Sequence, residues 1–325
     1  MLSAGVDLGG TKIQSVVLRA GKVVGSARVQ TPQEGVDSVV AAVAESVKTA
    51  LHNAQSDLED LAGAGIGTPG TIVGGTVANS SNVPGFESET PVPLAALVSK
   101  ALGGVRVVID NDVRVAVLGE QLKGAGRPYK NFLGVFVGTG VGGGLVIGGN
   151  RVEGGGAAGE IGHTLVKDGG RKCGCGKKGC LEAYAGRARM VETAQKWQAE
   201  GRKTKLFQIM DRKGSERATS GVIAAALAKH DPVVEELVDE AVWALGIAIA
   251  NAQNLLDLEA VIIGGGLGDR LGQPFVDRIA DAVRPRLHVA ERAPKFLTTE
   301  LGDLAGAVGA ALLAGQRPRT PVASG

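Results

Sequence analysis

Hydrophobic residues in this chain follow two patterns that alternate along the sequence. Short apolar runs predict buried strands at residues 5–10, 13–18, 22–30, 61–67, 105–110, 132–138, 143–149 and 259–265. Longer segments with helical spacing predict helices at residues 38–54, 238–256 and 303–315, with Asp303 as the N-cap of the last helix. Strands that alternate with helices in this way are typical of the α/β class.

The pattern that begins at Gly5 recurs at Gly134. Residues 5–24 and 134–153 align without a gap, so that a Gly-Val strand, a turn of small residues, an apolar strand and a second turn coincide. We therefore expect two domains built on one plan, with a ligand-binding cleft between them. Chance similarity is the alternative, because hairpins with glycine turns are common.

Two G-x-G-x-x-G motifs, at Gly65–Gly70 and Gly138–Gly143, raise the question of a dinucleotide site. Such a site needs a helix directly after the glycines, whose N-terminus holds the pyrophosphate. Both motifs are instead followed by residues that predict strand and turn, and no acidic residue stands at the ribose spacing. The P-loop motif G-x-x-x-x-G-K-[ST] does not occur. These observations exclude a Rossmann site and a P-loop.

The glycine turns of the repeat suit phosphate in another way, because clustered backbone N–H groups bind anions without a helix. The expected donors are Gly9, Gly10, Thr11 and Lys12 in the first turn and Gly138, Thr139 and Gly140 in the second. Asp7 stands at the end of the first strand, and a carboxylate there suits water-mediated Mg²⁺. A tight hairpin with no ligand is the alternative for either turn alone.

A candidate catalytic base follows the strand at residues 105–110. Asp110, Asn111 and Asp112 come at its carboxyl end, directly before a helical pattern, and such positions face the ligand crevice of α/β proteins. We expect Asp112 to accept the proton of a substrate hydroxyl and Asn111 to hydrogen-bond the same substrate. Alternatively, Asp110 or Asp112 is only the N-cap of the helix.

All three cysteines of the chain, Cys173, Cys175 and Cys180, lie within one glycine-rich loop. The sequence shows no secretory signal, so we expect a cytoplasmic protein in which thiols stay reduced. Cys₃His is a recognised structural zinc set, and His163 just upstream is the natural fourth ligand. A redox role is less favoured, because the loop lacks the C-x-x-C spacing.

Charge and hydropathy exclude other classes of function. The chain has 35 basic and 33 acidic residues, which argues against a nucleic-acid partner. The basic stretch 201–217 has one aromatic residue and interleaved acids, so a solvated helix and turn is expected there. The longest apolar runs are interrupted by Asn, Gln or Gly, so no membrane span is expected.

The motifs DLGGTK, DND, GTGVGGG, GAAGEIGH and CGCGKKGCLE occur in this order along the chain. Together they resemble the ROK family of sugar kinases and repressors, and most closely its bacterial glucokinases. The resemblance implies an actin-like ATPase (ribonuclease H-like) fold of two domains with a central cleft. It also implies transfer of the ATP γ-phosphoryl group to a hexose, with glucose as the expected substrate and Mg²⁺ and one structural Zn²⁺ as cofactors. We expect a small domain of residues 1–112, completed by helix 303–316, and a large domain of residues 113–302 with zinc loop 163–182.

Site residues follow from the resemblance, motif by motif. Asp112 corresponds to the catalytic base, and the nucleotide falls on the two phosphate turns and on the glycines after the strand at residues 259–265. The adenosine glycines are Gly264, Gly265 and Gly266. The implied sugar ligands are Gly67, Asn82, Asn111, Asp112, Glu160, His163 and Glu182. The implied zinc ligands are His163, Cys173, Cys175 and Cys180.

One position departs from the family pattern, and several alternatives stay open. Val113 and Arg114 stand where family members often have Ala-Asn, which makes the preferred sugar less certain. Among enzymes, one alternative is a kinase for another hexose (mannose, fructose or an N-acetylhexosamine). Another is a glucokinase that uses polyphosphate as the phosphoryl donor. The basic loop residues Arg171, Lys172, Lys177 and Lys178 are expected to form a solvated rim. A sugar-sensing regulator is less favoured, because its DNA-binding module would precede Asp7. The family commonly forms dimers or tetramers, to which the apolar helix 243–256 could contribute.

Overall fold

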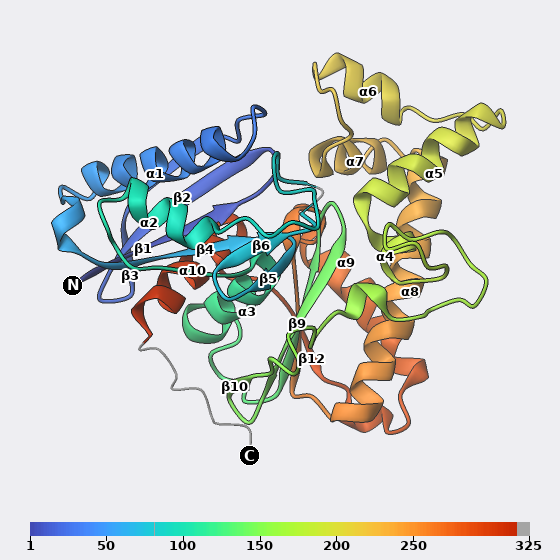
Figure 1. The fold of residues 1–325 in the computed structure, drawn as a ribbon. Helices are drawn as coiled ribbons and strands as arrows, with labels where there is room; N and C mark the ends of the chain where they lie inside the picture. Colours follow the sequence, from blue (N-terminus) through green and yellow to red (C-terminus); the bar gives the residue numbers. More distant parts are fainter. Residues whose placement is uncertain (81, 317–325) are drawn as a thin grey trace. The chain divides into compact units, whose positions relative to one another are not determined.

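The structure is a computed structural model that describes residues 1–80 and 82–316 (Figure 1). It contains two five-stranded sheets with helices packed on them, and a small hairpin of β5 (Thr71–Val73) and β6 (Thr76–Ala78). The expected α/β class is confirmed. The chain divides into two compact units, residues 1–124 with the segment that starts at Asp303, and residues 125–302.

The first unit is built on a sheet with the strand order β3-β2-β1-β4-β7. Its strands are β1 (Leu2–Leu8), β2 (Lys12–Arg19), β3 (Lys22–Gln30), β4 (Leu61–Thr68) and β7 (Val107–Asn111). β1 pairs antiparallel with β2 and parallel with β4, and β4 pairs parallel with β7. The carboxyl ends of β1, β4 and β7 therefore meet at one edge of the sheet.

Helices cover both faces of this sheet (Figure 1). On one face, α1 (Val36–Asn53) and α2 (Leu94–Ala101) share an apolar core with inward residues such as Val6. On the other, α10 (Ala305–Gly315) packs on the strands and on α3 (Asp112–Lys123). A Cβ at Gly65 would lie 1.9 Å from the carbonyl oxygen of Ala310, so α10 rests directly on strand backbone. This close approach explains why the last helix is rich in Ala and Gly.

The second unit repeats the plan with the strand order β10-β9-β8-β11-β12. Its strands are β8 (Phe132–Val137), β9 (Val141–Ile147), β10 (Asn150–Arg151), β11 (Ala260–Gly264) and β12 (Lys295–Thr298). β8 pairs antiparallel with β9 and parallel with β11, as β1 does with β2 and β4. The repeat predicted from residues 5–24 and 134–153 is therefore a structural repeat, and chance similarity is excluded.

The helices of the second unit form one large core with its sheet. They are α4 (Glu182–Ala185), α5 (Arg187–Ala199), α6 (Leu206–Arg212), α7 (Ser220–Leu227), α8 (Pro232–Leu256) and α9 (Gly265–Val283). α8 starts six residues before the predicted position, because Asp231 caps it by accepting from the N–H groups of Val233 and Val234. Ala241, Leu245 and Ile249 of this helix are buried in the core.

Two further details differ from the sequence predictions. The first unit ends after Gly124 and not at Asp112, because α3 packs on α10 and stays with the first sheet. The predicted N-cap role of Asp303 is wrong. α10 begins at Ala305 with Leu304 as its N-cap, and Asp303 lies in the preceding 3₁₀ turn.

Candidate functional site

Three strand ends in the first unit bring predicted site residues into one row. Asp7 of β1 lies opposite Gly67 of β4, and Gly67 lies opposite Asp110 of β7. These strands are parallel, so the residues after them leave the sheet at the same edge. A Cβ on Gly67 would lie 3.4 Å from the Cα atom of Asp112. The structure therefore gathers Asp7, Gly67, Asn111 and Asp112 at one sheet edge.

The first predicted phosphate turn joins β1 to β2. The N–H of Gly9 donates to the carbonyl of Lys12 (3.0 Å), so it closes the turn and is not, as predicted, offered to a ligand. A Cβ on Gly10 would lie 1.8 Å from the carbonyl oxygen of Asn82. This contact places the predicted sugar ligand Asn82 beside the turn. Thr11 is exposed, which leaves its side chain at the surface of the turn.

The carboxyl group of Asp7 has an unusual environment. Burial, together with the carboxylates of Asp112 and Asp303, raises the pKa of Asp7 to about 7, and the ammonium group of Lys12 opposes this shift. Lys12 in turn lies 3.6 Å from Asp303. Two acidic groups close enough to perturb each other form a site that a divalent cation would neutralise. This arrangement fits the predicted role of Asp7 in holding Mg²⁺ through water.

In the Asp-Asn-Asp segment, one residue caps the following helix and the other two do not. The side-chain oxygen of Asn111 accepts from the N–H groups of Val113 (3.0 Å) and Arg114 (3.3 Å) and is the N-cap of α3. Neither Asp110 nor Asp112 is the cap, so that alternative is wrong. Asp112 occupies the first helical turn, where its Oδ1 accepts from the N–H of Val113 (2.9 Å).

The four predicted zinc ligands lie together in the second unit. The ligand atoms of His163, Cys173, Cys175 and Cys180 are all within 4.8 Å of one another. Cys175 Sγ is 3.8 Å from Cys180 Sγ, and Cys173 Sγ is 3.8 Å from His163 Nδ1. Tetrahedral zinc with bonds of about 2.3 Å to sulfur places its ligand atoms about 3.5–3.8 Å apart. The spacing fits a four-ligand zinc site and does not fit a disulfide.

The three thiols differ in how easily they ionise. Burial raises the pKa of Cys173 to about 12 and raises that of Cys180. A hydrogen bond from the backbone N–H of Lys177 lowers the pKa of Cys175. Buried thiols of this kind become thiolates when a metal ion binds them. His163, Cys173, Cys175 and Cys180 would hold the ion, which would supply a structural crosslink.

Two predicted sugar ligands are attached to this metal-binding loop. Glu182 is the first residue of α4 and follows Cys180 closely. Its Oε2 accepts from the N–H of Val141 (3.0 Å), and its Oε1 lies 3.6 Å from Cys173 Sγ. Glu160 precedes the 3₁₀ turn Ile161–His163, and its carbonyl accepts from the N–H of His163 (3.0 Å). Folding of the loop therefore fixes the backbone positions of Glu160, His163 and Glu182 together.

The residues predicted for the nucleotide also lie together in the second unit. The turn Gly138–Gly140 joins β8 to β9 and is closed by a hydrogen bond from Gly138 N–H to the carbonyl of Gly140 (2.9 Å). Gly265, with a φ of +80°, begins α9 directly after β11. A Cβ there would lie 2.8 Å from backbone atoms of Val137, the residue before Gly138. The glycines Gly264–Gly266 are thus beside the second phosphate turn.

Comparison with known proteins decides the family. The ROK family model matches residues 3–317. The chain belongs to the ROK family. It is 36% identical to a glucokinase of Halalkalibacterium halodurans, over 96% of this chain and 94% of that protein. It is 32% identical to a glucokinase of Streptomyces coelicolor, over 96% of this chain and 97% of that protein.

A solved structure supports the same assignment. The ROK family glucokinase of Streptomyces griseus, in complex with glucose and AMPPNP, matches with a TM-score of 0.81 and 32% identity. The match covers 98% of this chain and 100% of that chain. The actin-like ATPase fold implied by the sequence motifs is confirmed by this likeness.

The departure from the family pattern after Asp112 has a structural counterpart in this ROK protein. Arg114 Nε lies 2.9 Å from Asp110 Oδ1, and both side chains are largely buried. The same Asp110 oxygen accepts from the N–H of Asn111 (2.8 Å). Arg114 therefore pairs with the strand that carries the site and stabilises the conformation of the Asp-Asn-Asp segment.

Two arginines of this ROK protein have roles that the sequence did not reveal. Arg171 was expected in a solvated rim, but its guanidinium binds Glu240 of α8 (2.7 Å) and stacks on the ring of Tyr184 at 5.0 Å. That expectation is wrong for Arg171, whereas Lys172, Lys177 and Lys178 are exposed. Arg187, which no motif singled out, donates to Thr139 Oγ1 (2.7 Å) in the second phosphate turn.

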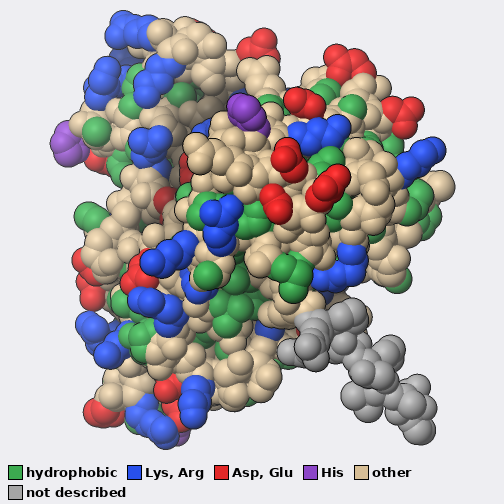
Figure 2. Space-filling view, turned by 90° about the vertical axis from the view of Figure 1, so that its left-hand side faces the viewer, with side chains coloured by type: hydrophobic (Ala, Val, Ile, Leu, Met, Phe, Trp, Pro, Cys, Tyr) green, Lys and Arg blue, Asp and Glu red, His purple; other side chains and the backbone are tan. Residues whose placement is uncertain are grey.

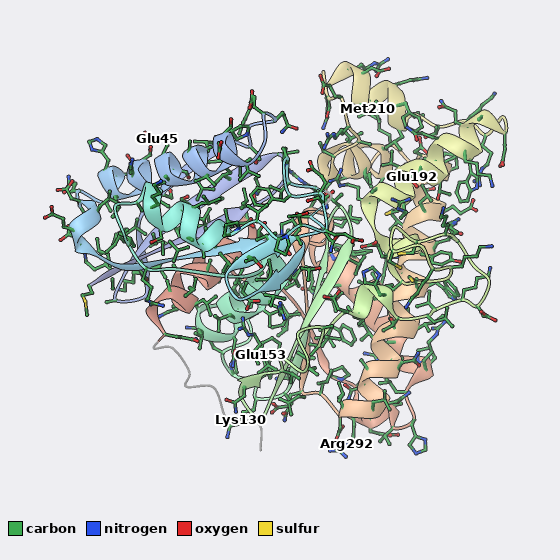
Figure 3. The ribbon with its side chains drawn as sticks, viewed as in Figure 1. Glu45, Lys130, Glu153, Glu192, Met210 and Arg292 are labelled. Carbon is green, nitrogen blue, oxygen red and sulfur yellow. The ribbon has the colours of Figure 1, made fainter. Side chains whose placement is uncertain are left out.

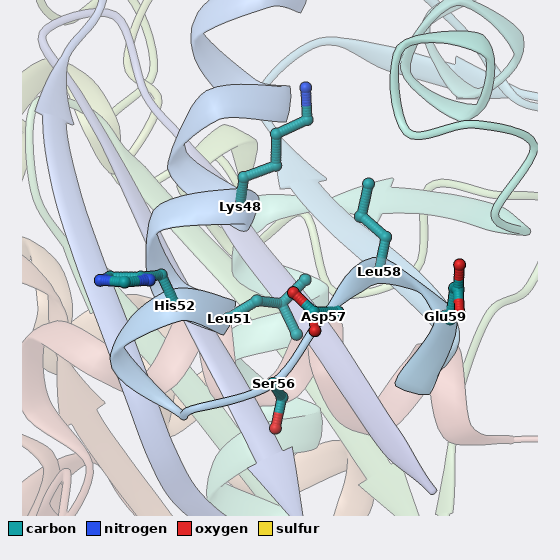
Figure 4. A pocket seen from close by; sticks show the side chains of 7 residues that line it. All are labelled: Lys48, Leu51, His52, Ser56, Asp57, Leu58 and Glu59. Carbon is teal, nitrogen blue, oxygen red and sulfur yellow. The ribbon is translucent and has the colours of Figure 1, made fainter.

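The molecular surface adds little to this site. On the face shown in Figure 2, basic and acidic side chains are interspersed, which agrees with the balanced composition. No helix in the described residues has the length and apolar character needed to cross a membrane. A surface pocket at the end of α1 includes Lys48, His52, Asp57 and Glu59 in its lining (Figure 4). None of the predicted site residues lines it, so we assign it no part in the reaction.

Proposed function

We propose that this ROK protein transfers the γ-phosphoryl group of ATP to glucose and releases glucose 6-phosphate and ADP. The observation that carries the proposal is the row formed by Asp7, Gly67 and Asp110, which sets Asp112 at the strand edge beside the first phosphate turn. The relatives described above are named glucokinases over nearly the whole chain, which supports glucose as the acceptor.

Asp112 acts as the general base in this proposal. Its carboxylate accepts the proton of the sugar hydroxyl while that oxygen attacks the γ-phosphorus, and the bond from phosphorus to the β-phosphate oxygen breaks. Position depends on the Asn111 cap and on the Asp110–Arg114 pair, which fix the backbone on both sides of the base. Since phosphoryl transfer needs little covalent chemistry from the protein, positioning is the main contribution of these residues.

The two glycine turns hold the phosphates of ATP. The first unit supplies Thr11 and Lys12, and the second supplies Thr139 and Gly140, since the N–H of Gly138 closes its own turn as that of Gly9 does. Asp7 would hold Mg²⁺ through water, and the ion would neutralise charge on the phosphates. A cation held there would also lower the raised pKa of Asp7 and so favour the ionised carboxylate.

The metal-binding loop orients the sugar ligands and takes no part in bond making. A closed Cys₃His site leaves no open coordination position for substrate. In the proposal Glu160, His163 and Glu182 contact the sugar hydroxyls, with Asn82 and Asn111 on the first unit. His163 has one ring nitrogen for the metal and one for the sugar, as in other metal-bound histidines that bind a second partner.

A hexose and donor panel tests this proposal. Zinc-replete protein is assayed for ADP release with ATP and Mg²⁺ against glucose, mannose, fructose and N-acetylhexosamines, and glucose is also tested with polyphosphate as donor. We expect glucose with ATP to give the highest kcat/KM, by about tenfold or more over the other sugars. Preference for another hexose would contradict the substrate, and preference for polyphosphate would contradict the donor. No phosphorylation with any combination of sugar and donor would contradict the enzyme assignment.

A further inference from the structure

Arg187 connects the second phosphate turn to the start of α5. Its N–H donates to the carbonyl of Gly138 (3.1 Å), and the N–H of Ala188 donates to the carbonyl of Thr139 (3.0 Å). Its guanidinium donates to Thr139 Oγ1 (2.7 Å) and to the carbonyl of Ala218 (2.7 Å). Arg187 therefore holds the turn through its backbone and its side chain, and the backbone of Ala188 adds a further contact.

The second phosphate turn and Arg187 have hydrogen-bond donors for which the described residues provide no acceptor. A guanidinium has donors only, so Thr139 Oγ1 accepts from Arg187 and must direct its single hydroxyl hydrogen to another acceptor. The Nε of Arg187 is buried and has no hydrogen-bond partner among the described residues. The ion pairs found in the described part of the chain do not include Arg187. The site has surplus positive charge and surplus donors, which an anion would satisfy.

Neighbouring groups strengthen this imbalance. The partners of the guanidinium, a hydroxyl and a carbonyl, carry no net charge, and the charged neighbour that acts on it is a second arginine, Arg217. Burial and Arg217 both lower the pKa of Arg187, so the positive charge of the guanidinium is held in an unfavourable environment that a nearby anion would relieve.

Arg187 also reaches the region predicted for adenosine. Its partner Ala218 lies two residues before Ser220, the first residue of α7. A Cβ on Gly266 would lie 3.3 Å from Ser220 Oγ. The guanidinium is therefore bonded on one side to the phosphate turn and on the other to a segment that contacts the adenosine glycines.

We propose that Arg187 is a positioning residue for the phosphates of a bound nucleotide. It holds Thr139 so that the Thr139 hydroxyl donates to a phosphate oxygen, and its charge balances the phosphate. The inference rests on the proposed function, because it assumes that a nucleotide binds here. In it, Arg187 contributes to binding of the phosphates and not to binding of the adenosine.

Titration calorimetry with adenosine, AMP and ADP on the zinc-loaded protein tests this inference. We expect Arg187→Gln to weaken ADP binding about tenfold or more and to leave adenosine binding within about twofold. Arg187→Lys keeps the positive charge but loses the guanidinium with its several N–H donors, so its ADP affinity should lie between those of wild type and Arg187→Gln. Lys196→Gln is the matched control, because Lys196 lies on the same helix, is exposed and pairs only loosely with Glu200 (3.8 Å).

A double-mutant cycle separates positioning from a general structural effect. Because Arg187 acts through the Thr139 hydroxyl, Arg187→Gln with Thr139→Val should weaken ADP binding less than the sum of the single changes. Equal losses of adenosine and ADP affinity, unchanged ADP affinity in Arg187→Gln, or additive effects would overturn the inference. So would wild-type protein that binds ADP no more tightly than adenosine.

The binding series needs no sugar, so it is independent of the glucose assay. Failure of the wild-type protein to phosphorylate glucose, with phosphate-dependent binding that is lost in Arg187→Gln, would contradict the proposed function and support this inference. Phosphorylation of glucose with unchanged nucleotide affinity in Arg187→Gln would support the function and contradict the inference.

Discussion

The carboxylate of Glu182 accepts a hydrogen bond from the backbone N–H of Val141 at 3.0 Å. Its other oxygen lies 3.6 Å from Cys173 Sγ in the metal-binding loop. One side chain therefore joins that loop to the first residue of β9, directly after the second phosphate turn. The predicted sugar ligands on the loop and the predicted phosphate donors in the turn are therefore linked by the contacts of Glu182.

We predict that Glu182→Gln raises the KM for glucose by about tenfold or more, because hydrogen bonds to charged groups are worth about 1.5–3 kcal/mol. The bound zinc should stay at one ion per chain, since Glu182 is not one of the four ligands. Steady-state kinetics with elemental analysis of the protein checks both. Glu192→Gln on α5 (Figure 3) is the control, because Glu192 is exposed and pairs with Arg189, one helical turn before it. A normal KM in Glu182→Gln would remove Glu182 from the sugar site.

Removal of one thiolate should affect metal and sugar together. In Cys175→Ala the set falls to three ligands, and we predict loss of zinc and a glucose KM raised by about tenfold or more. Cys175 is exposed, so the substitution leaves no cavity in the core. Lys178→Ala on the same loop should change neither property. A zinc-free Cys175→Ala protein with full activity would show that the loop does not depend on metal.

Asp7 should make stability depend on pH. The pKa of Asp7 is about 7 in the folded chain and close to the ordinary 3.8 when unfolded. Between these values the folded state keeps a proton that the unfolded state has lost, so stability falls as the pH rises from about 4 to about 7. Asp7→Asn removes this loss, and we predict a Tm about 2–4 °C above wild type at about pH 8, with no gain at about pH 4.

Thermal unfolding without Mg²⁺ or nucleotide is the measurement for Asp7. Asp37→Asn is the control, because Asp37 makes the same chemical change at the exposed first turn of α1. An equal difference between Asp7→Asn and wild type at both pH values would show that Asp7 titrates normally. The same variant should also lose activity, since the carboxylate would hold Mg²⁺.

Arg171 should stabilise the fold of the metal-binding loop. Its ion pair with Glu240 ties the residues before Cys173 to α8, and its contact with Tyr184 ties them to α4. Because the pair is partly exposed, we predict that Arg171→Ala costs about 1–3 kcal/mol and lowers the Tm by about 2–6 °C. Lys172→Ala, at an exposed neighbouring position, should leave the Tm within about 1 °C. Equal Tm values for the two variants would show that Arg171 does not stabilise the loop and that the expected solvated rim describes it correctly.

Sequence patterns were sufficient where the determinants are local. Short apolar runs at residues 5–10 and 132–138 predict β1 and β8, although β1 spans Leu2–Leu8, and the spacing of identical residue types predicts the cysteine loop. The internal repeat was visible because both hairpins keep one register. These features depend on neighbours along the chain, and such signals survive in a single sequence.

The features that the sequence did not predict depend on contacts between residues far apart in the chain, or on which of several neighbouring residues takes a role. Arg187 meets Thr139 across 48 positions, and Arg171 meets Glu240 across 69 positions, so no local pattern marks either contact. The cap of α3 was sought at Asp110 or Asp112, whereas Asn111 between them has the capping geometry. All three residue types are good caps, so only the backbone conformation decides among them.

The most direct test of the central claim is the kcat for glucose phosphorylation by Asp112→Asn. We predict a loss of at least about 10²-fold, because the amide cannot accept the proton of the attacking hydroxyl, while nucleotide binding stays close to wild type. Asp37→Asn should retain full kcat. Near-normal turnover by Asp112→Asn would contradict the assignment of the base and with it the proposed mechanism.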